Sequence, residues 1–227
     1  MEIMGRHAGW LAASAALASE VVEGPDLIYL PETVFDKERF LADVRAVYEK
    51  KNSCLVAVSE GVQYADGTFV SEAKTSATDG FGHAQLGGLA AILADMVKQN
   101  LGCKVRGIEL SLLQRAGAHL ASQTDINEAY MAGCEAVRHA VAGVTGKMVG
   151  FERAYENGSY VCKYVLLPLS IVANAEKKIP AEWINEAGNG VNRQFMDYAL
   201  PLIAGENTRP TVNGLPRFAN LKKIKAE

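Results

Sequence analysis

The chain has 227 residues, of which 49% are hydrophobic and 22% are charged, a composition typical of a globular protein with its own core. Its net charge of −3 and pI of about 5.9 argue against a nucleic-acid or anionic-membrane partner. The sequence has neither an apolar run long enough to span a bilayer nor a secretory signal pattern. We therefore expect a cytoplasmic protein that contacts neither nucleic acid nor membrane.

The four cysteines are far apart and have no histidine at ligand spacing. They are Cys54, Cys103, Cys134 and Cys162. This spacing favours buried or reduced thiols over a zinc site or a redox motif, so we expect no metal ligands among them.

Four apolar runs have the length and β-branched content of buried strands: residues 27–30, 55–58, 105–113 and 161–167. Pro31 ends the first run, and the turn signal Asn157-Gly158 precedes the last. The second run is continuously apolar, as expected for a strand with helices on both faces.

Helical spacing of apolar residues predicts three helices between these runs. The first covers residues 40–48 with Asp36 as its N-cap, the second covers 86–97, and the third begins at a capping-box spacing at Ser122. Gly80-Phe81-Gly82 is interpreted as a turn and helix start, because it lacks the spacing of a phosphate-binding loop. This alternation predicts an α/β fold with a doubly wound, mostly parallel sheet and helices on both faces.

A further loop, Met4-Gly5-Arg6, opens a predicted helix over residues 8–18, with no strand expected in front of it. The beginning of a helix favours anions, and Arg6 adds a forked donor for phosphate oxygens.

Polar residues follow the predicted strands, where ligands collect in open α/β sheets. Glu32, Glu60 and Arg115 are each the second residue after such a run, and Arg106 lies within one. Arginines bind phosphate and a carboxylate accepts from sugar hydroxyls, so the set suits a sugar phosphate. Each residue alone is more often a solvated, capping or loop residue, so the residues by themselves support only a phosphosugar-binding α/β domain.

At these same positions the chain resembles the phosphofructokinase family. Met4-Gly5-Arg6-His7-Ala8-Gly9-Trp10 resembles the family's substrate motif, and Val58-Ser59-Glu60-Gly61 is similar to the segment whose glutamate contacts fructose hydroxyls. Leu113-Gln114-Arg115-Ala116-Gly117 resembles the segment whose arginine binds the 6-phosphate, and Lys147-Met148-Val149-Gly150 is similar to a later strand. The resemblance runs from Met4 to about Gly150.

The resemblance implies a role for each matching residue. It implies that Met4, Gly5 and Arg6 contact the sugar phosphate, that Glu60 contacts its hydroxyls, and that Arg115 binds the 6-phosphate. Arg106 is similar to an arginine that reaches a neighbouring subunit's sugar phosphate, which implies a homo-oligomer. The segment 151–158 and the long tail look more like the pyrophosphate-using branch, a glycolytic transferase with pyrophosphate as donor and Mg²⁺ in the intact enzyme.

The sequence departs from the family in three ways. Leu112 stands where many members have a histidine or tyrosine that donates to the phosphate, and His119 is one conceivable substitute. Ala116 replaces the first glycine of a pair. The glycine-rich donor loop and the Thr-Ile-Asp-Asn-Asp segment, which supplies the general base and positions Mg²⁺, do not occur here. We therefore expect no catalytic residue in this chain and no phosphorylation of fructose 6-phosphate by it alone.

The resemblance divides the chain into three parts. Residues 1–119 are expected to bind fructose 6-phosphate, 120–170 to return to a missing donor-binding domain, and 171–227 to form a helical and irregular extension. Because 120–150 would lack its covering sheet, we expect exposed apolar surface and association with an N-terminal half or a second copy. The alternatives are a fragment of an ATP-dependent 6-phosphofructokinase, a non-catalytic sugar-phosphate-binding module, and a subunit whose role is assembly.

Overall fold

The computed structural model describes residues 1–71, 88–220 and 222–225. Its centre is a parallel three-stranded sheet in the order β1-β3-β2, formed by β1 (Glu2–Ile3), β2 (Leu27–Tyr29) and β3 (Val56–Ser59). Both outer strands pair with β3 in parallel, with Glu2 opposite Val58 and Ile28 opposite Ala57. The predicted α/β class with a parallel sheet is confirmed.

A strand does precede the Met4-Gly5-Arg6 loop, so the expectation of a loop without one is wrong. Backbone hydrogen bonds run from Val58 N to Met1 O at 3.0 Å and from Glu60 N to Ile3 O at 2.9 Å. These bonds place the loop at the carboxyl end of β1. A strand of two residues is too short to give the period-two signal from which strands are predicted.

The strand expected over 105–113 is also wrong. This segment is extended, and its pairing with other described residues is a single bridge between Glu109 and Glu2, supported by a hydrogen bond of 2.8 Å from Glu2 N to Ile108 O. Among the described residues, its neighbour in the sheet is β1, which offers two residues for pairing. The chain then turns at Ser111, whose φ is 44°, and forms the short helix α4 (Leu113–Ala116).

The three predicted long helices form. They are α2 (Lys37–Lys51), α3 (Leu89–Leu101) and α5 (Gln123–Val141). The Asp36 side chain accepts from Arg39 N at 2.7 Å, and Ser122 accepts from Asp125 N at 3.1 Å, so both N-caps are confirmed. The Gly80-Phe81-Gly82 turn and Leu86 lie outside the described residues.

The helix expected over 8–18 is shorter than predicted. It appears as α1 (Trp10–Ser14), which continues as the 3-10 helix η1 (Ala15–Glu20). Alanines are the commonest residue of this segment, and Ala12 and Ala13 are fully buried against the sheet.

Alternating side chains of the sheet face two separate cores. Leu27, Tyr29 and Val58 join one cluster with α2 and α3, whereas Ile28 and Ala57 join another with α1 and α7 (Arg193–Ala199). Helices therefore cover both faces of the sheet, as predicted.

The second core contains residues from near the end of the chain. Ile179 is 3% exposed and Phe195 is fully buried, and Trp10 packs against the ring of Phe195 with centroids 6.1 Å apart. The segment that carries them includes the 3-10 helices η4 (Ala181–Trp183) and η5 (Leu200–Ile203). The part of the chain after residue 171 thus completes the hydrophobic core around α1.

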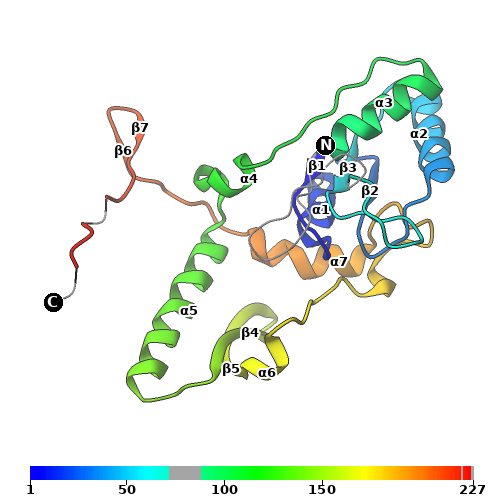
Figure 1. Cartoon of the computed structure of the whole chain (residues 1–227). Helices are drawn as coiled ribbons and strands as arrows, with labels where there is room; N and C mark the ends of the chain where they lie inside the picture. Colours follow the sequence, from blue (N-terminus) through cyan, green and yellow to red (C-terminus); the bar gives the residue numbers. More distant parts are fainter. Residues whose placement is uncertain (72–87, 221, 226–227) are drawn as a thin grey trace.

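A second part of the molecule stands apart from the parallel sheet (Figure 1). It holds α5 and an antiparallel hairpin of β4 (Lys147–Glu156) and β5 (Ser159–Pro168), followed by α6 (Leu169–Val172). The hairpin turns at Asn157-Gly158, with φ values of 52° and 80°, as the turn signal predicted.

The C-terminal segment after Ile203 is irregular, as predicted, apart from a small hairpin. This hairpin pairs β6 (Thr211–Val212) with β7 (Leu215–Pro216) and extends away from both parts (Figure 1). No helix in the described residues is long and apolar enough to cross a bilayer.

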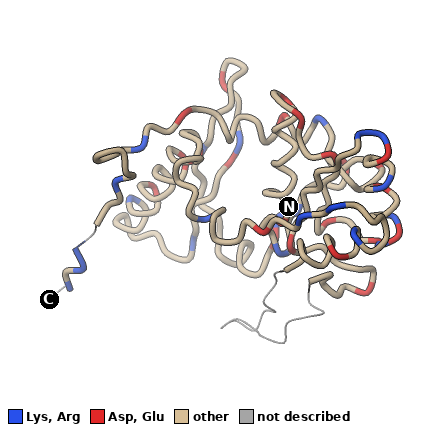
Figure 2. Tube along the Cα trace, turned by 90° about the horizontal axis from the view of Figure 1, so that it is seen from above, with Lys and Arg blue, Asp and Glu red and all other residues tan. Residues whose placement is uncertain are grey.

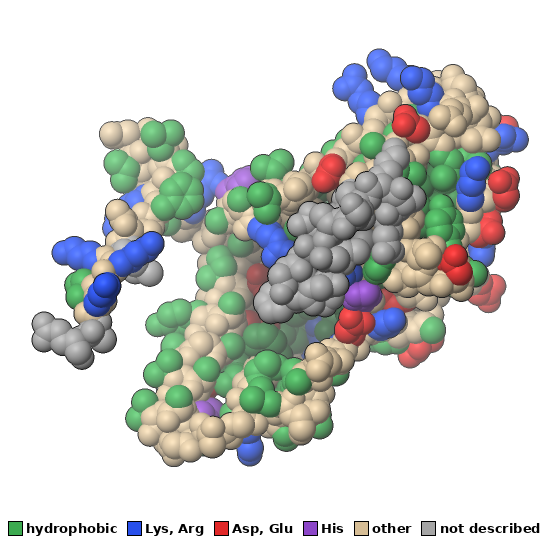
Figure 3. Space-filling model, in the orientation of Figure 1, with side chains coloured by type: hydrophobic (Ala, Val, Ile, Leu, Met, Phe, Trp, Pro, Cys, Tyr) green, Lys and Arg blue, Asp and Glu red, His purple; other side chains and the backbone are tan. Residues whose placement is uncertain are grey.

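Apolar side chains are exposed along the second part (Figure 3). None of the residues of α5 is buried, and Tyr130 and Val141 are 72% and 85% exposed. A 19-residue helix without a buried residue is unusual in a globular protein, because amphipathic helices gain most of their stability from packing their apolar face against other elements.

Candidate functional site

The loop that follows β1 is hydrogen-bonded to the residue that follows β3. The backbone amide of Gly5 donates to Oε1 of Glu60 at 3.1 Å, and the Ser59 hydroxyl donates to the carbonyl of Gly5. Because β1 and β3 are parallel neighbours, their carboxyl ends lie at the same edge of the sheet. The sheet therefore brings the Met4-Gly5-Arg6 loop and Glu60 together, although they are 55 residues apart.

Two glycines allow this close approach. Gly5 has a φ of 148°, which side-chain-bearing residues rarely adopt, and a Cβ there would lie 2.7 Å from Ala8 O. A Cβ on Gly61 would lie 1.6 Å from the carbonyl oxygen of Arg6. The backbones of the two segments thus cross at a distance that only glycine permits.

The helix α4 joins the same edge through a side chain. The backbone amide of Met4 donates to Oε1 of Gln114 at 3.1 Å. Arg115 is the next residue of α4, and its side chain is exposed and does not line this junction's cavity. The sequence motif contained Gln114 without giving it a function, and its position directly before Arg115 is the signal that could have identified it.

A cavity of about 90 Å³ lies where these segments meet, and its lining includes Met4, Glu60 and Gln114 together with Glu2, Glu109 and Ser111. Ligand pockets usually have at least about 300 Å³. The cavity by itself is therefore smaller than a typical ligand pocket.

The cavity is rich in carboxylates. Glu2 is only 4% exposed and accepts a hydrogen bond of 2.8 Å from Ala90 N. Burial raises the pKa of Glu2, and the nearby Glu109 and Glu60 raise it further. Among the described residues, no group of three or more His, Cys, Asp or Glu side chains is arranged to hold a metal ion.

The three arginines of the predicted site are placed differently. Arg6 is half-buried directly after Gly5, and Arg115 is exposed on α4. Arg106 is exposed and lines a separate hollow with Met1 and Ala90, so the structure does not bring it to Glu60 within one chain.

Two further residues from the sequence analysis lie away from this cavity's lining. Leu112 is 70% exposed at the start of α4 and offers no polar group. His119, in the 3-10 helix η3 (Ala118–Leu120), lines a different cavity from Glu60.

The carboxylate of Glu32 accepts hydrogen bonds from the backbone. Its Oε1 accepts from Gly9 N at 2.9 Å, at the beginning of α1, and from Ile179 N at 3.1 Å. A carboxylate already occupies the first turn of this helix, so the expected anion site at its N-terminus is not available.

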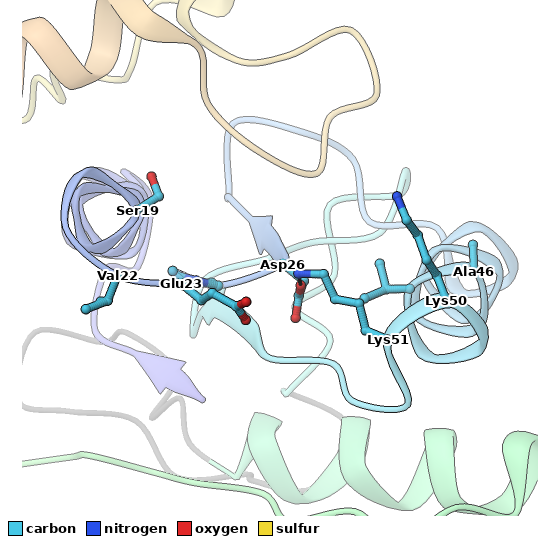
Figure 4. A pocket seen from close by; sticks show the side chains of 10 residues that line it. Ser19, Val22, Glu23, Asp26, Ala46, Lys50 and Lys51 are labelled. Carbon is cyan, nitrogen blue, oxygen red and sulfur yellow. Dashed lines mark hydrogen bonds and ion pairs between the residues drawn. The ribbon is translucent and has the colours of Figure 1, made fainter.

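A wider hollow of about 580 Å³ lies at the opposite end of the sheet, between η1 and α2 (Figure 4). Its lining includes Glu23, Asp26, Lys50 and Lys51, and Lys51 points toward Asp26, with which it forms an ion pair. Asp26 precedes β2, at the amino ends of the strands. This hollow is therefore not part of the site around Glu60.

Comparison with known proteins identifies the family of this chain. A family model described as Phosphofructokinase matches residues 1–140. The chain is 44% identical over 229 residues to the pyrophosphate–fructose 6-phosphate 1-phosphotransferase of Halomonas elongata, covering 100% of the chain and 54% of that protein. It is 45% identical over 227 residues to the enzyme of that name from Xanthomonas campestris, covering 98% of the chain and 53% of the relative.

The fold agrees with a solved structure as well. A crystal structure of pyrophosphate-dependent phosphofructokinase from Nitrosospira multiformis superposes with a TM-score of 0.84 at 41% identity, covering 98% of the chain and 52% of that structure. The chain belongs to the phosphofructokinase family. It spans about half the length of the curated relatives it matches and corresponds to their C-terminal part.

Proposed function

We propose that this chain supplies the fructose 6-phosphate-binding part of a cytoplasmic pyrophosphate–fructose 6-phosphate 1-phosphotransferase. The observation that carries the proposal is the junction of three distant segments at one sheet edge: Gly5 contacts Glu60, and Met4 contacts Gln114. The names of the relatives described above support pyrophosphate rather than ATP as the phosphoryl donor.

In this proposal each side chain has a role that follows from its chemistry. Arg6 and Arg115 bind phosphate oxygens, because guanidinium groups offer forked donors that match them. Glu60 accepts from sugar hydroxyls, while its Oε1 also holds the Gly5 amide. Met4 and Gly5 form the wall of the site with their backbone, and a neighbouring subunit supplies Arg106.

We assign no catalytic step to these residues. Phosphoryl transfer needs positioned charge around the transferring group, and in this family an Asp-rich segment and Mg²⁺ provide it. The sequence contains no Asp-x-Asp stretch. We therefore propose that the 227 residues bind the acceptor sugar and require further elements to transfer a phosphoryl group. A coupled assay on the purified chain, with pyrophosphate, Mg²⁺ and fructose 6-phosphate, should detect no fructose 1,6-bisphosphate.

The exposed apolar surface of the second part supports the proposed division at residues 119 and 170. The side chains of Tyr130, Val137 and Val141 point out of α5 and are at least 65% exposed. We propose that residues 120–170 pack against a donor-binding domain or a second copy. Sedimentation velocity and binding of a hydrophobic dye test this: a monomer that binds no dye contradicts it.

Titration calorimetry with fructose 6-phosphate tests the site itself. Arg6→Ala, Glu60→Ala and Arg115→Ala should each weaken binding by about tenfold or more, the loss of one charge-assisted hydrogen bond. Arg45→Ala is the matched control, because Arg45 is an exposed arginine of α2 outside the proposed site. Unchanged binding in all three site variants would remove the assignment.

A further inference from the structure

A separate cavity has a lining of the opposite charge. It measures about 450 Å³ and lies between η3 and the β6–β7 hairpin, with His119, Arg209, Arg217 and Phe218 in its lining. The lining holds three basic side chains and no carboxylate, whereas the cavity beside Glu60 is lined by three glutamates.

The two arginines flank the β6–β7 hairpin, whose backbone is paired. Arg217 N donates to Pro210 O at 3.0 Å, next to the pairs Thr211–Pro216 and Val212–Leu215. Pro210 and Pro216 restrict the backbone on both strands, and Asn213-Gly214 forms the turn with positive φ at both residues. The backbone that carries Arg209 and Arg217 is therefore already ordered around the cavity.

The remaining wall of the cavity is attached to the same segment. The Asn207 side chain donates to Ala118 O at 3.3 Å, which connects the segment before β6 to η3 beside His119. Two backbone bonds reinforce this attachment, from Gln123 N to Gly205 O at 3.0 Å and from Thr124 N to Ala204 O at 3.2 Å. All three basic side chains are thus carried by backbone that is hydrogen-bonded together.

The positive charges of the cavity's two arginines are not paired with acidic side chains of the described residues. Within the described part of the chain, neither Arg209 nor Arg217 makes a salt bridge or a side-chain hydrogen bond. Residues 207–225 contain five basic residues and no acidic one, so the other residues hold 18 basic and all 26 acidic side chains. Figure 2 shows this segment with blue and no red along it. Like charges at a shared cavity repel one another, and a bound anion removes that cost.

We propose that this cavity binds a small phosphate-bearing anion through Arg209, Arg217 and His119. Two forked guanidinium donors suit the several oxygens of a phosphate or diphosphate group. A volume of about 450 Å³ also accommodates a larger organic phosphate, with the ring of Phe218 available to its apolar part. The site shares no lining residue with the cavity at Glu60 and does not depend on the proposed sugar site.

Titration calorimetry on the 227-residue chain tests this with three separate probes: pyrophosphate, inorganic phosphate and fructose 6-phosphate. At least one probe should bind the parent chain. Arg209→Ala and Arg217→Ala should each weaken the affinity for that probe by about tenfold, whereas Arg6→Ala should leave the affinity unchanged. The probe that binds best identifies the source of the phosphate group. Arg217→Lys, which keeps the charge but loses the fork, should recover only part of the affinity.

Arg45→Ala serves again as a control for the loss of one positive charge. Because Arg209 and Arg217 are exposed, their alanine variants should keep the circular dichroism spectrum and the Tm of the parent chain. The proposal is overturned if no probe binds, if both arginine variants bind like the parent, or if Arg45→Ala weakens binding as much as they do.

Discussion

The amide of Gly5 and the carboxylate of Glu60 are joined by a hydrogen bond of 3.1 Å, which connects the ends of two neighbouring parallel strands. The bond is partly buried, so its loss would leave the Gly5 amide without its acceptor. Glu60 therefore has a structural contact in addition to the ligand contact proposed for it.

Glu60→Ala should lower the free energy of unfolding by about 1–3 kcal/mol, the cost of an unsatisfied donor. Glu60→Gln keeps a carbonyl oxygen as acceptor and should cost less. Urea unfolding measures both values, and hydrogen exchange of the Gly5 amide should speed up only in the alanine variant. Equal losses in the two variants would show that the negative charge, not the acceptor, is what matters.

Gly61→Ala should disrupt the loop crossing, because its Cβ would lie 1.6 Å from the carbonyl oxygen of Arg6. The backbone on one side must move, so we expect a lower Tm and loss of fructose 6-phosphate binding. Gly133→Ala is the matched control: a Cβ there meets no atom within 4 Å, and alanine favours the helix α5 by about 1 kcal/mol. A Gly61→Ala variant with the parent's Tm and affinity would contradict the described crossing.

Glu2 should make stability depend on pH. Its pKa is raised above the ordinary value of 4.5, so the folded state holds the proton more tightly than the unfolded state. This preference favours folding at low pH and is lost as pH rises from about the ordinary value through the raised one. Glu2→Gln cannot ionise and still offers an oxygen to Ala90 N.

The difference in unfolding free energy between Glu2→Gln and the parent should therefore shift in favour of the variant as pH rises through that window. Urea unfolding at a series of pH values measures this difference. A difference that is flat with pH, or that shifts in favour of the parent, would contradict the raised pKa.

Phe195→Ala should be strongly destabilising, because Phe195 is fully buried in the core that joins α7 to α1. The expected loss is about 3–5 kcal/mol, from lost burial and the cavity left behind. Leu215→Ala, in the exposed hairpin, should change the free energy of unfolding by less than about 0.5 kcal/mol. Similar losses in the two variants would mean that the C-terminal segment does not stabilise the core.

The sequence by itself determined much of the local structure. The caps at Asp36 and Ser122, the helices that follow them and the turn at Asn157-Gly158 were all predictable, because each rests on side chains and backbone preferences within a few residues. The family was also readable from Met4-Gly5-Arg6 and the motifs that follow it in order, and the comparisons confirm it.

Only the tertiary structure decided how these segments meet. The two-residue strand β1, the lack of a strand over 105–113 and the capping of α1 by Glu32 all depend on partners far away in the sequence. The same holds for the burial of Phe195 and for the basic cavity of Arg209 and Arg217. Contacts between residues so far apart leave no local periodicity in the sequence. They form only when folding brings the two surfaces together.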